Sequence, residues 1–145
     1  MDKTTSLSVL LIRVALGAIF IAHGYMKLFV FGIGGVIKSF TAMGIPLPAI
    51  LGTIVTLLEF FGGIAILIGL LTRWISLLFV VEFLVALFKV HLANGFFIGR
   101  GMDGQFHYGF EFVFLILFAS LALSIMKAGN YSLDHALFEK EKRSE

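Results

Sequence analysis

The sequence predicts an all-α fold, a four-helix transmembrane bundle, and three observations point to it. Hydrophobic residues make up 59% of the 145 residues and charged residues only 14%. That composition lies well outside the range of soluble domains. The apolar residues also fall into four long runs separated by glycine-rich, proline-containing or charged stretches, and a helix needs about 20 apolar residues to cross a bilayer. Because no polar linker divides the chain, we expect one membrane domain over residues 1–145.

The first predicted span covers residues 7–30 and carries three polar side chains of interest. Arg13 and Lys27 are two heptads apart, so they lie on one stripe of a helix. His23 is one turn before Lys27 on the same side. Charged side chains within a span turn away from lipid, so we expect this stripe to face other helices.

After the first span the glycine-rich residues 31–35 interrupt the helix, and residues 36–43 are predicted to form a short amphipathic helix. The proline-containing residues 44–48 stop that helix and start the next span. The second predicted span covers residues 49–71 and is closed by Arg73.

Glu59 lies near the middle of the second span. Gly52 is one heptad before it and Arg73 two heptads after it, so the three share one helix face. Glycines beside that face allow a neighbouring helix to approach closely. We therefore expect Glu59 to face protein and to pair with Arg13 or Arg73, since an unpaired charge at this depth is costly.

The third predicted span, residues 74–93, follows after a turn so short that the second and third spans must be antiparallel neighbours. Glu82 and Lys89 are seven residues apart and share a face, while His91 and Asn94 lie near the far end. The pair Asn94-Gly95 is a stop signal for a helix.

A glycine-rich loop over residues 96–106 is too polar to lie in hydrocarbon. The fourth predicted span covers residues 108–126, and His107 and Glu111 are expected one helical turn apart at its start. Residues 131–145 form a short charged tail.

The distribution of lysine and arginine outside the spans predicts the orientation. The side that holds both termini and the second loop carries six basic residues, and the other side carries two. The six are Lys3, Arg73, Lys127, Lys140, Lys142 and Arg143, and the two are Lys38 and Arg100. The positive-inside rule then places both termini in the cytoplasm of a bacterial-type inner membrane. The net charge of +2 reflects this topology, and we expect no binding to nucleic acid.

The predicted spans contain cations and carboxylates in equal number. The cations are Arg13, Lys27 and Lys89, and the carboxylates are Glu59, Glu82 and Glu111. One interpretation is structural, with paired charges that fix the register of the helices. The other is functional, because a charge at the centre of a span costs about 2.5 to 3.5 kcal/mol and such residues by default mark a pathway or a site.

His23, His91, His107 and Glu111 come from three predicted spans at similar depth in the outer half of the bundle. The set is compatible with a metal site, a haem or a polar pocket for a ligand head group. It lacks HxxxH or ExxH spacing, which disfavours a metal, and a haem needs a wide cleft. A quinone pocket fits better, since the ring oxygens need hydrogen-bond donors and titratable groups move protons. The chain has no cysteine, so thiol chemistry and iron–sulfur clusters are excluded.

Several motifs, in this order, resemble the DoxX family. They are Arg13…Phe20-Ile-Ala-His-Gly24…Lys27, then Glu59-Phe-Phe-Gly-Gly63 and Gly69-Leu-Leu-Thr-Arg73, then Lys89-Val-His91 and Asn94-Gly-Phe96, then Glu111 and Asn130-Tyr-Ser-Leu-Asp134. The resemblance covers residues 7–134. It implies a small inner-membrane protein of four helices, grouped with the subunits of thiosulfate:quinone oxidoreductase and with proteins linked to quinone, catechol or thiol stress.

We therefore predict a component of quinone-linked redox chemistry, with a non-enzymatic scaffold or small-molecule transporter as the alternative. The predicted catalytic residues are Glu59, Glu111 and His91; the predicted ligand-binding residues are His23, Lys27, Lys89, Asn94 and His107; the predicted structural charges are Arg13, Arg73 and Glu82. Quinone is the expected cofactor, with haem or a metal as alternatives. The expected partners are the lipid bilayer, a lipophilic small molecule, and a redox partner protein or further copies of the chain.

Overall fold

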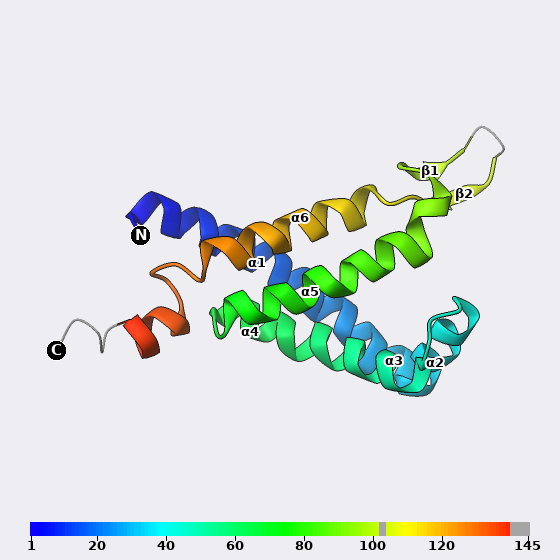
Figure 1. The fold of residues 1–145 in the computed structure, drawn as a ribbon, viewed down its shortest axis with the longest axis horizontal. Helices are drawn as coiled ribbons and strands as arrows, with labels where there is room; N and C mark the ends of the chain where they lie inside the picture. The colour runs from blue at the N-terminus through cyan, green and yellow to red at the C-terminus, as the bar shows by residue number, and fades with distance from the viewer. Residues whose placement is uncertain (102–103, 140–145) are drawn as a thin grey trace.

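The computed structural model describes residues 1–101 and 104–139, and it confirms the predicted all-α membrane bundle (Figure 1). Among these residues, three helical segments are long and apolar enough to cross a membrane, Lys3–Ala42, Pro48–Ile68 and Thr72–Asn94. A shorter apolar helix, α6 (Glu111–Met126), packs with them. Large apolar side chains are exposed along all four segments, as expected for helices that face lipid.

The first segment starts at Asp2, whose carboxylate accepts a hydrogen bond of 2.8 Å from the Thr5 amide. This bond and a second one from the Thr5 hydroxyl lower the pKa of the Asp2 carboxyl. Helix α1 (Lys3–Tyr25) continues as a π-helix, η1 (Met26–Phe31). The backbone then turns at Gly32, which has φ of +68°, and α2 (Gly32–Ala42) leaves in a new direction. The predicted break after the first span is therefore confirmed.

The second and third segments match the predicted spans closely. The second consists of α3 (Pro48–Leu57), η2 (Leu58–Gly62) and α4 (Gly63–Ile68). The third consists of α5 (Thr72–Ala86), η3 (Leu87–His91) and the short 3-10 helix η4 (Leu92–Asn94). Gly69, in the left-handed conformation with φ of +75°, ends α4 and opens the tight turn between them.

The start of the fourth span was predicted wrongly. Residues 106–108 form a strand, β2 (Phe106–Tyr108), which pairs with β1 (Ile98–Arg100) in an antiparallel hairpin. His107 lies opposite Gly99 in this hairpin, and α6 begins only at Glu111. Gly109 permits the change, because a Cβ there would lie 2.3 Å from the Phe97 carbonyl oxygen.

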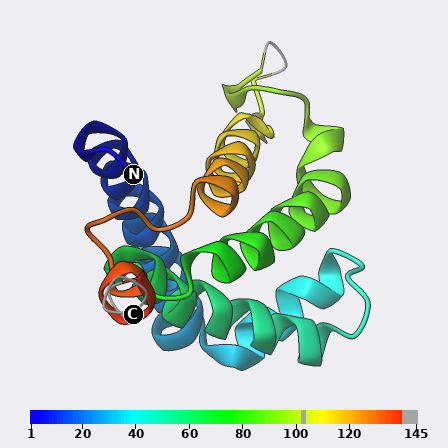
Figure 2. The same cartoon turned by 60° about the vertical axis from the view of Figure 1, so that its left-hand side comes forward.

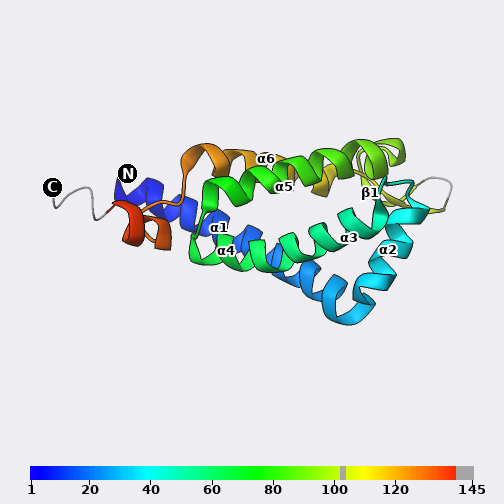
Figure 3. The same cartoon turned by 60° about the horizontal axis from the view of Figure 1, so that its bottom comes forward.

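Close contacts of α1 with α4 and η2, and of α5 with α6, organise the bundle, while α2 packs on α3 (Figures 2 and 3). Glycines set the separation of α1 from α4, since a Cβ on Gly17 would lie 3.0 Å from the Gly63 carbonyl oxygen. Phe20 and Phe79 stack in the core with ring centroids 3.6 Å apart.

The elongated bundle has two ends, which we name by what they carry. The terminal end holds Met1, the turn at Gly69 and the segment after α6, where the Asn130 side chain donates to the Met1 carbonyl at 3.0 Å (Figure 3). It also holds the π-helix η5 (His135–Glu139). The hairpin end holds α2 and the strands. Lys140, Lys142 and Arg143, which were counted as basic residues on the cytoplasmic side, lie outside the described residues.

Candidate functional site

A cavity of about 450 Å³ lies in the half of the bundle nearer the hairpin end. Its walls come from all the apolar helical segments and from α2, and most of its lining is apolar. The charged and polar side chains that line it are His23, Lys27, Ser39, Glu59, Glu82 and His91. Sequence analysis selected five of these six as candidate residues; Ser39 on α2 was missed because nothing in its local pattern marks it.

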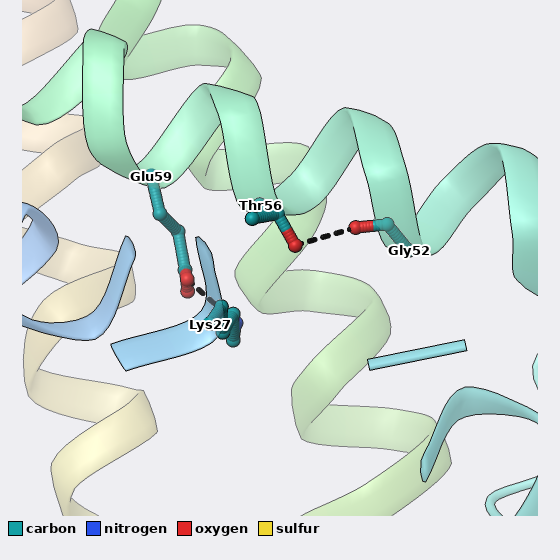
Figure 4. A network of polar contacts seen from close by, with 4 residues as sticks. All are labelled: Lys27, Gly52, Thr56 and Glu59. Atoms are coloured by element: carbon teal, nitrogen blue, oxygen red, sulfur yellow. Dashed lines mark hydrogen bonds and ion pairs between the residues drawn. The ribbon is translucent and has the colours of Figure 1, made fainter. Parts of the chain in front are cut away.

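Lys27 and Glu59 form the electrostatic centre of this cavity (Figure 4). The Lys27 ammonium lies 2.6 Å from Oε2 of Glu59, and the Glu59 side chain is 4% exposed against 24% for Lys27. The buried Oε2 of Glu59 therefore has the Lys27 ammonium as its charged partner. Thr56 lies one turn before Glu59, and its hydroxyl donates a hydrogen bond of 2.7 Å to the Gly52 carbonyl. The Thr56 hydroxyl therefore does not donate to Glu59.

Glu82 completes a triad with these two residues. Its carboxyl group interacts with the Glu59 carboxyl and with the Lys27 ammonium, and its Oε2 is buried without a hydrogen-bond donor. Two carboxyl groups and one ammonium give the triad a charge of −1 when all three are ionised. The triad is therefore electrically neutral only when it holds one additional proton.

The two cavity histidines come from different helical segments. His23 on α1 packs against the Phe112 ring, with centroids 6.4 Å apart. His91 is on η3, and its Nδ1 atom lies 3.0 Å from the Tyr108 carbonyl oxygen. The Asn94 side chain contacts the same carbonyl at 3.4 Å. His91 thus joins the cavity wall to the base of the hairpin.

Turns of π-helix place three of the polar side chains in the cavity. Lys27 lies on η1, Glu59 on η2 and His91 on η3. A π turn inserts an extra residue into an α-helix and is found frequently at functional sites. The extra residue rotates the side chains that follow it about the helix axis. Heptad spacing assumes an unbroken α-helix, so it could not predict the directions of these side chains correctly.

Arg13 was predicted to be a structural charge paired with Glu59, and the partner is wrong, because Arg13 binds backbone carbonyls instead. The Arg13 side chain is 1% exposed and lies at the terminal end. It donates four hydrogen bonds to backbone carbonyls, those of Ile66, Leu67, Ala128 and Tyr131, at 2.6 to 3.0 Å. The Ile66 and Leu67 carbonyls belong to the last turn of α4, where the helix dipole favours a cation, and the other two carbonyls follow the end of α6. Arginine suits the task because its guanidinium carries five donors in a rigid plane.

The tail motif is a second element of this end whose role sequence analysis missed. The Asp134 carboxylate accepts hydrogen bonds from the amides of Leu71 and Thr72 at 2.7 and 2.9 Å, and so caps α5. The Asp134 amide donates to the Gly69 carbonyl at 2.9 Å. A Cβ on Gly69 would lie 2.5 Å from the Arg13 guanidinium and from the Ser132 side chain. The motifs around Arg13, Gly69 and Asp134 therefore form one structural joint.

The remaining predicted site residues lie outside the cavity lining. Glu111 accepts a hydrogen bond of 3.0 Å from the Ile98 amide and thereby holds the hairpin. Lys89 and Arg73 are exposed and form no ion pair with any residue that the structure describes. His107 is on β2. Within residues 1–101 and 104–139, no group of three or more histidine, cysteine, aspartate or glutamate side chains could hold a metal ion.

Comparison with known proteins identifies close relatives. The family model named DoxX matches residues 8–92. The chain is 30% identical over 142 residues to the protein named "Putative oxidoreductase CatD" of Bacillus subtilis, covering 98% of this chain and 96% of that one. It is 32% identical over 140 residues to "Inner membrane protein YqjF" of Escherichia coli, covering 97% and 99%. No solved structure matches the chain.

Proposed function

This chain belongs to the DoxX family, and we propose that it is a membrane component of quinone-linked redox chemistry whose cavity binds the ring of a quinone or quinol. The observation that carries the proposal is the Lys27–Glu59–Glu82 triad in the wall of an otherwise apolar cavity within the membrane. The name of the Bacillus subtilis relative, an oxidoreductase, agrees with this chemistry.

The size and lining of the cavity suit a small lipophilic molecule. Ligand pockets in proteins hold about 300 to 1,000 Å³ and combine apolar walls with a few polar groups that orient the ligand. The cavity of about 450 Å³ has this character. A quinone dissolved in the bilayer reaches such a site from the lipid, without crossing the aqueous phase.

One buried oxygen atom favours a ligand that donates a hydrogen bond. Oε2 of Glu82 has no hydrogen-bond donor among the described residues. A buried acceptor left without a donor costs about 1 to 3 kcal/mol. The hydroxyl groups of a quinol would remove that cost, while the ring oxygens of a quinone would accept from Lys27 or a protonated His23 or His91.

Proton balance gives the triad its chemical role. Reduction of a quinone to a quinol takes up electrons and protons in equal number, and oxidation releases them. The triad holds one proton more in its neutral form than in its fully ionised form, so it can supply or accept a proton at the ring oxygen. The two electrons would be exchanged with a redox partner protein, and the triad would supply or accept one of the two protons, while the second would pass through His23 or His91.

The test is saturable binding of a short-chain quinone analogue to the purified protein in lipid nanodiscs. Glu59→Gln, Glu82→Gln and His91→Ala should each weaken binding at least about tenfold, equivalent to about 1.4 kcal/mol. Glu111→Gln is the matched control, because it removes a carboxylate that lies outside the cavity lining. Its affinity should equal that of the unchanged protein.

Other results would reject the proposal. A Soret band in the purified protein would assign the histidines to a haem, and a stoichiometric metal would assign them to a metal site. Absence of saturable binding by the unchanged protein in lipid would favour the scaffold or transporter alternative. A loss of binding in Glu111→Gln equal to that in Glu59→Gln would place the ligand outside the cavity.

A further inference from the structure

A second hollow, at the terminal end of the bundle, has no part in the proposed quinone site. Its volume is about 310 Å³, and Arg73, Trp74, Lys127 and His135 are among the residues that line it. These residues come from the start of α5, from the position after α6 and from η5. We name this hollow the basic groove.

The charge of the basic groove is positive. Arg73 and Lys127 are both exposed, and neither forms an ion pair with a residue in the described part of the chain. The Asp134 carboxylate also lines the groove, but its two oxygens accept from the amides of Leu71 and Thr72. The two cations are therefore left facing a groove whose only described carboxylate is already hydrogen-bonded to backbone.

The backbone around the basic groove is held in place before any ligand arrives. Arg13 binds the carbonyls of Ala128 and Tyr131, directly after Lys127. Lys127 itself has φ of +64°, in the left-handed region that residues other than glycine rarely adopt. The surrounding contacts over-determine this conformation, as is required when backbone strain persists in a native fold. The backbone on this side of the groove is thus held by hydrogen bonds to a buried side chain.

The residues of the basic groove lie at the ends of apolar helices, where the hydrocarbon layer is expected to end. Arg73 and Trp74 are near the first residue of the Thr72–Asn94 span, and Lys127 follows the last residue of α6. Trp74 is 65% exposed, and exposed tryptophan at the end of a span is typical of the lipid headgroup region. Arginine and lysine at this depth attract anionic lipid headgroups.

We propose that the basic groove binds the phosphate of an anionic phospholipid headgroup, with Arg73 and Lys127 as the charged contacts and Trp74 beside the glycerol region. Arginine can donate two parallel hydrogen bonds to phosphate oxygens, and Lys127, which also lines the groove, adds a second charge. A lipid is favoured over a free anion because the groove opens beside exposed apolar residues, Leu71 and Trp74.

The experiment measures binding of phosphatidylglycerol to the purified full-length protein in phosphatidylcholine nanodiscs by native mass spectrometry. Arg73→Gln and Lys127→Gln should each reduce phosphatidylglycerol occupancy about fivefold. Lys3→Gln is the matched control, because it removes an exposed cation at the same end of the bundle, outside the groove. Lys127→Gly is a second variant that removes the charge and also relieves the positive φ, so loss of folding cannot explain its result.

Each result decides the proposal. Equal phosphatidylglycerol occupancy in Arg73→Gln, Lys127→Gly and Lys3→Gln would overturn it. Competition by millimolar inorganic phosphate alone, with no preference for phosphatidylglycerol over phosphatidylcholine, would also overturn it by showing that the ligand is a free anion. Quinone binding should be unchanged in these variants, so the outcome is independent of the proposed function.

Discussion

The buried cations of this bundle show how the partner of a charge determines its role. Arg13 satisfies its guanidinium with four backbone carbonyls, so it needs no carboxylate and acts as a joint between helices. Lys27 has a carboxylate within 2.6 Å and belongs to a triad whose charge changes with one proton. The first arrangement is complete, whereas the second leaves a buried oxygen of Glu82 without a hydrogen-bond donor. The proposed ligand would bind at this second arrangement.

The first prediction concerns Arg13. In Arg13→Lys the charge remains, but the three donors of the lysine ammonium are on one nitrogen and cannot bind all four carbonyls. Hydrogen bonds to charged groups contribute about 1.5 to 3 kcal/mol each, so we expect the free energy of unfolding in detergent to fall by about 3 kcal/mol or more. Arg73→Lys is the control, since Arg73 is exposed, and it should leave stability unchanged. Equal effects of the two changes would show that the joint does not depend on the guanidinium.

The second prediction concerns coupling within the triad. Lys27→Met should destabilise most, because it leaves two carboxyl groups without their cation. Glu59→Gln should cost less, because Lys27 still faces Glu82. The double variant should be milder than the sum of the single changes by about 0.5 to 3 kcal/mol, measured by unfolding in detergent. The Arg13→Met and Glu59→Gln pair should be additive, and strong coupling there with none between Lys27 and Glu59 would contradict the structure.

At the scale of elements, the π turns explain what could and could not be predicted from the sequence. The existence of the helices, the break at Gly32 and the tight turn at Gly69 follow from apolar runs and glycines. Side-chain directions after Lys27, Glu59 and His91 do not, because sequence spacing assumes an α-helix throughout. Five of the predicted residues therefore line one cavity, whereas the expected pairing of Glu59 with Arg13 or Arg73 is not seen, because Glu59 pairs with Lys27. The hairpin was missed because its strands are short and lie in a glycine-rich stretch.

The third prediction tests the close approach of α1 to η2. A Cβ on Gly24 would lie 2.3 Å from the Phe60 amide nitrogen and 2.8 Å from the Glu59 carbonyl carbon. Gly24→Ala must push η2 away and separate Glu59 from Lys27. Overpacking of this kind costs about 1 to 3 kcal/mol, so we expect a lower unfolding temperature and weaker quinone binding together.

Gly34→Ala supplies the control for that variant. Gly34 also lies within a helix, but a Cβ there would meet nothing within 4 Å. Alanine is favoured over glycine in a helix by about 1 kcal/mol, so Gly34→Ala should be neutral or slightly stabilising. If Gly24→Ala behaved in the same way, the α1 contact with η2 would be looser than the structure has it.

At the scale of the whole molecule, the two ends of the bundle are built for different tasks. The terminal end is closed by the joint of Arg13, Gly69 and Asp134, in which backbone groups are satisfied by side chains. The core around Phe20 and Phe79 separates this end from the cavity. The cavity half contains the triad and the π turns, and its walls enclose about 450 Å³. The terminal end is therefore closed by side-chain to backbone hydrogen bonds, while the other half leaves room for the proposed ligand.

The last prediction concerns orientation, which follows from the same division into two ends. Among described residues, Lys3, Arg73 and Lys127 lie at the terminal end, while Lys38 and Arg100 lie at the hairpin end. The positive-inside rule then places the terminal end in the cytoplasm and opens the cavity half toward the outer face. Green fluorescent protein fused after Glu145 should fluoresce, and alkaline phosphatase fused there should be inactive. Alkaline phosphatase inserted after Gly104 should be active. The reverse pattern would place the cavity half toward the cytoplasm, and the quinone would then exchange protons with the inner side of the membrane.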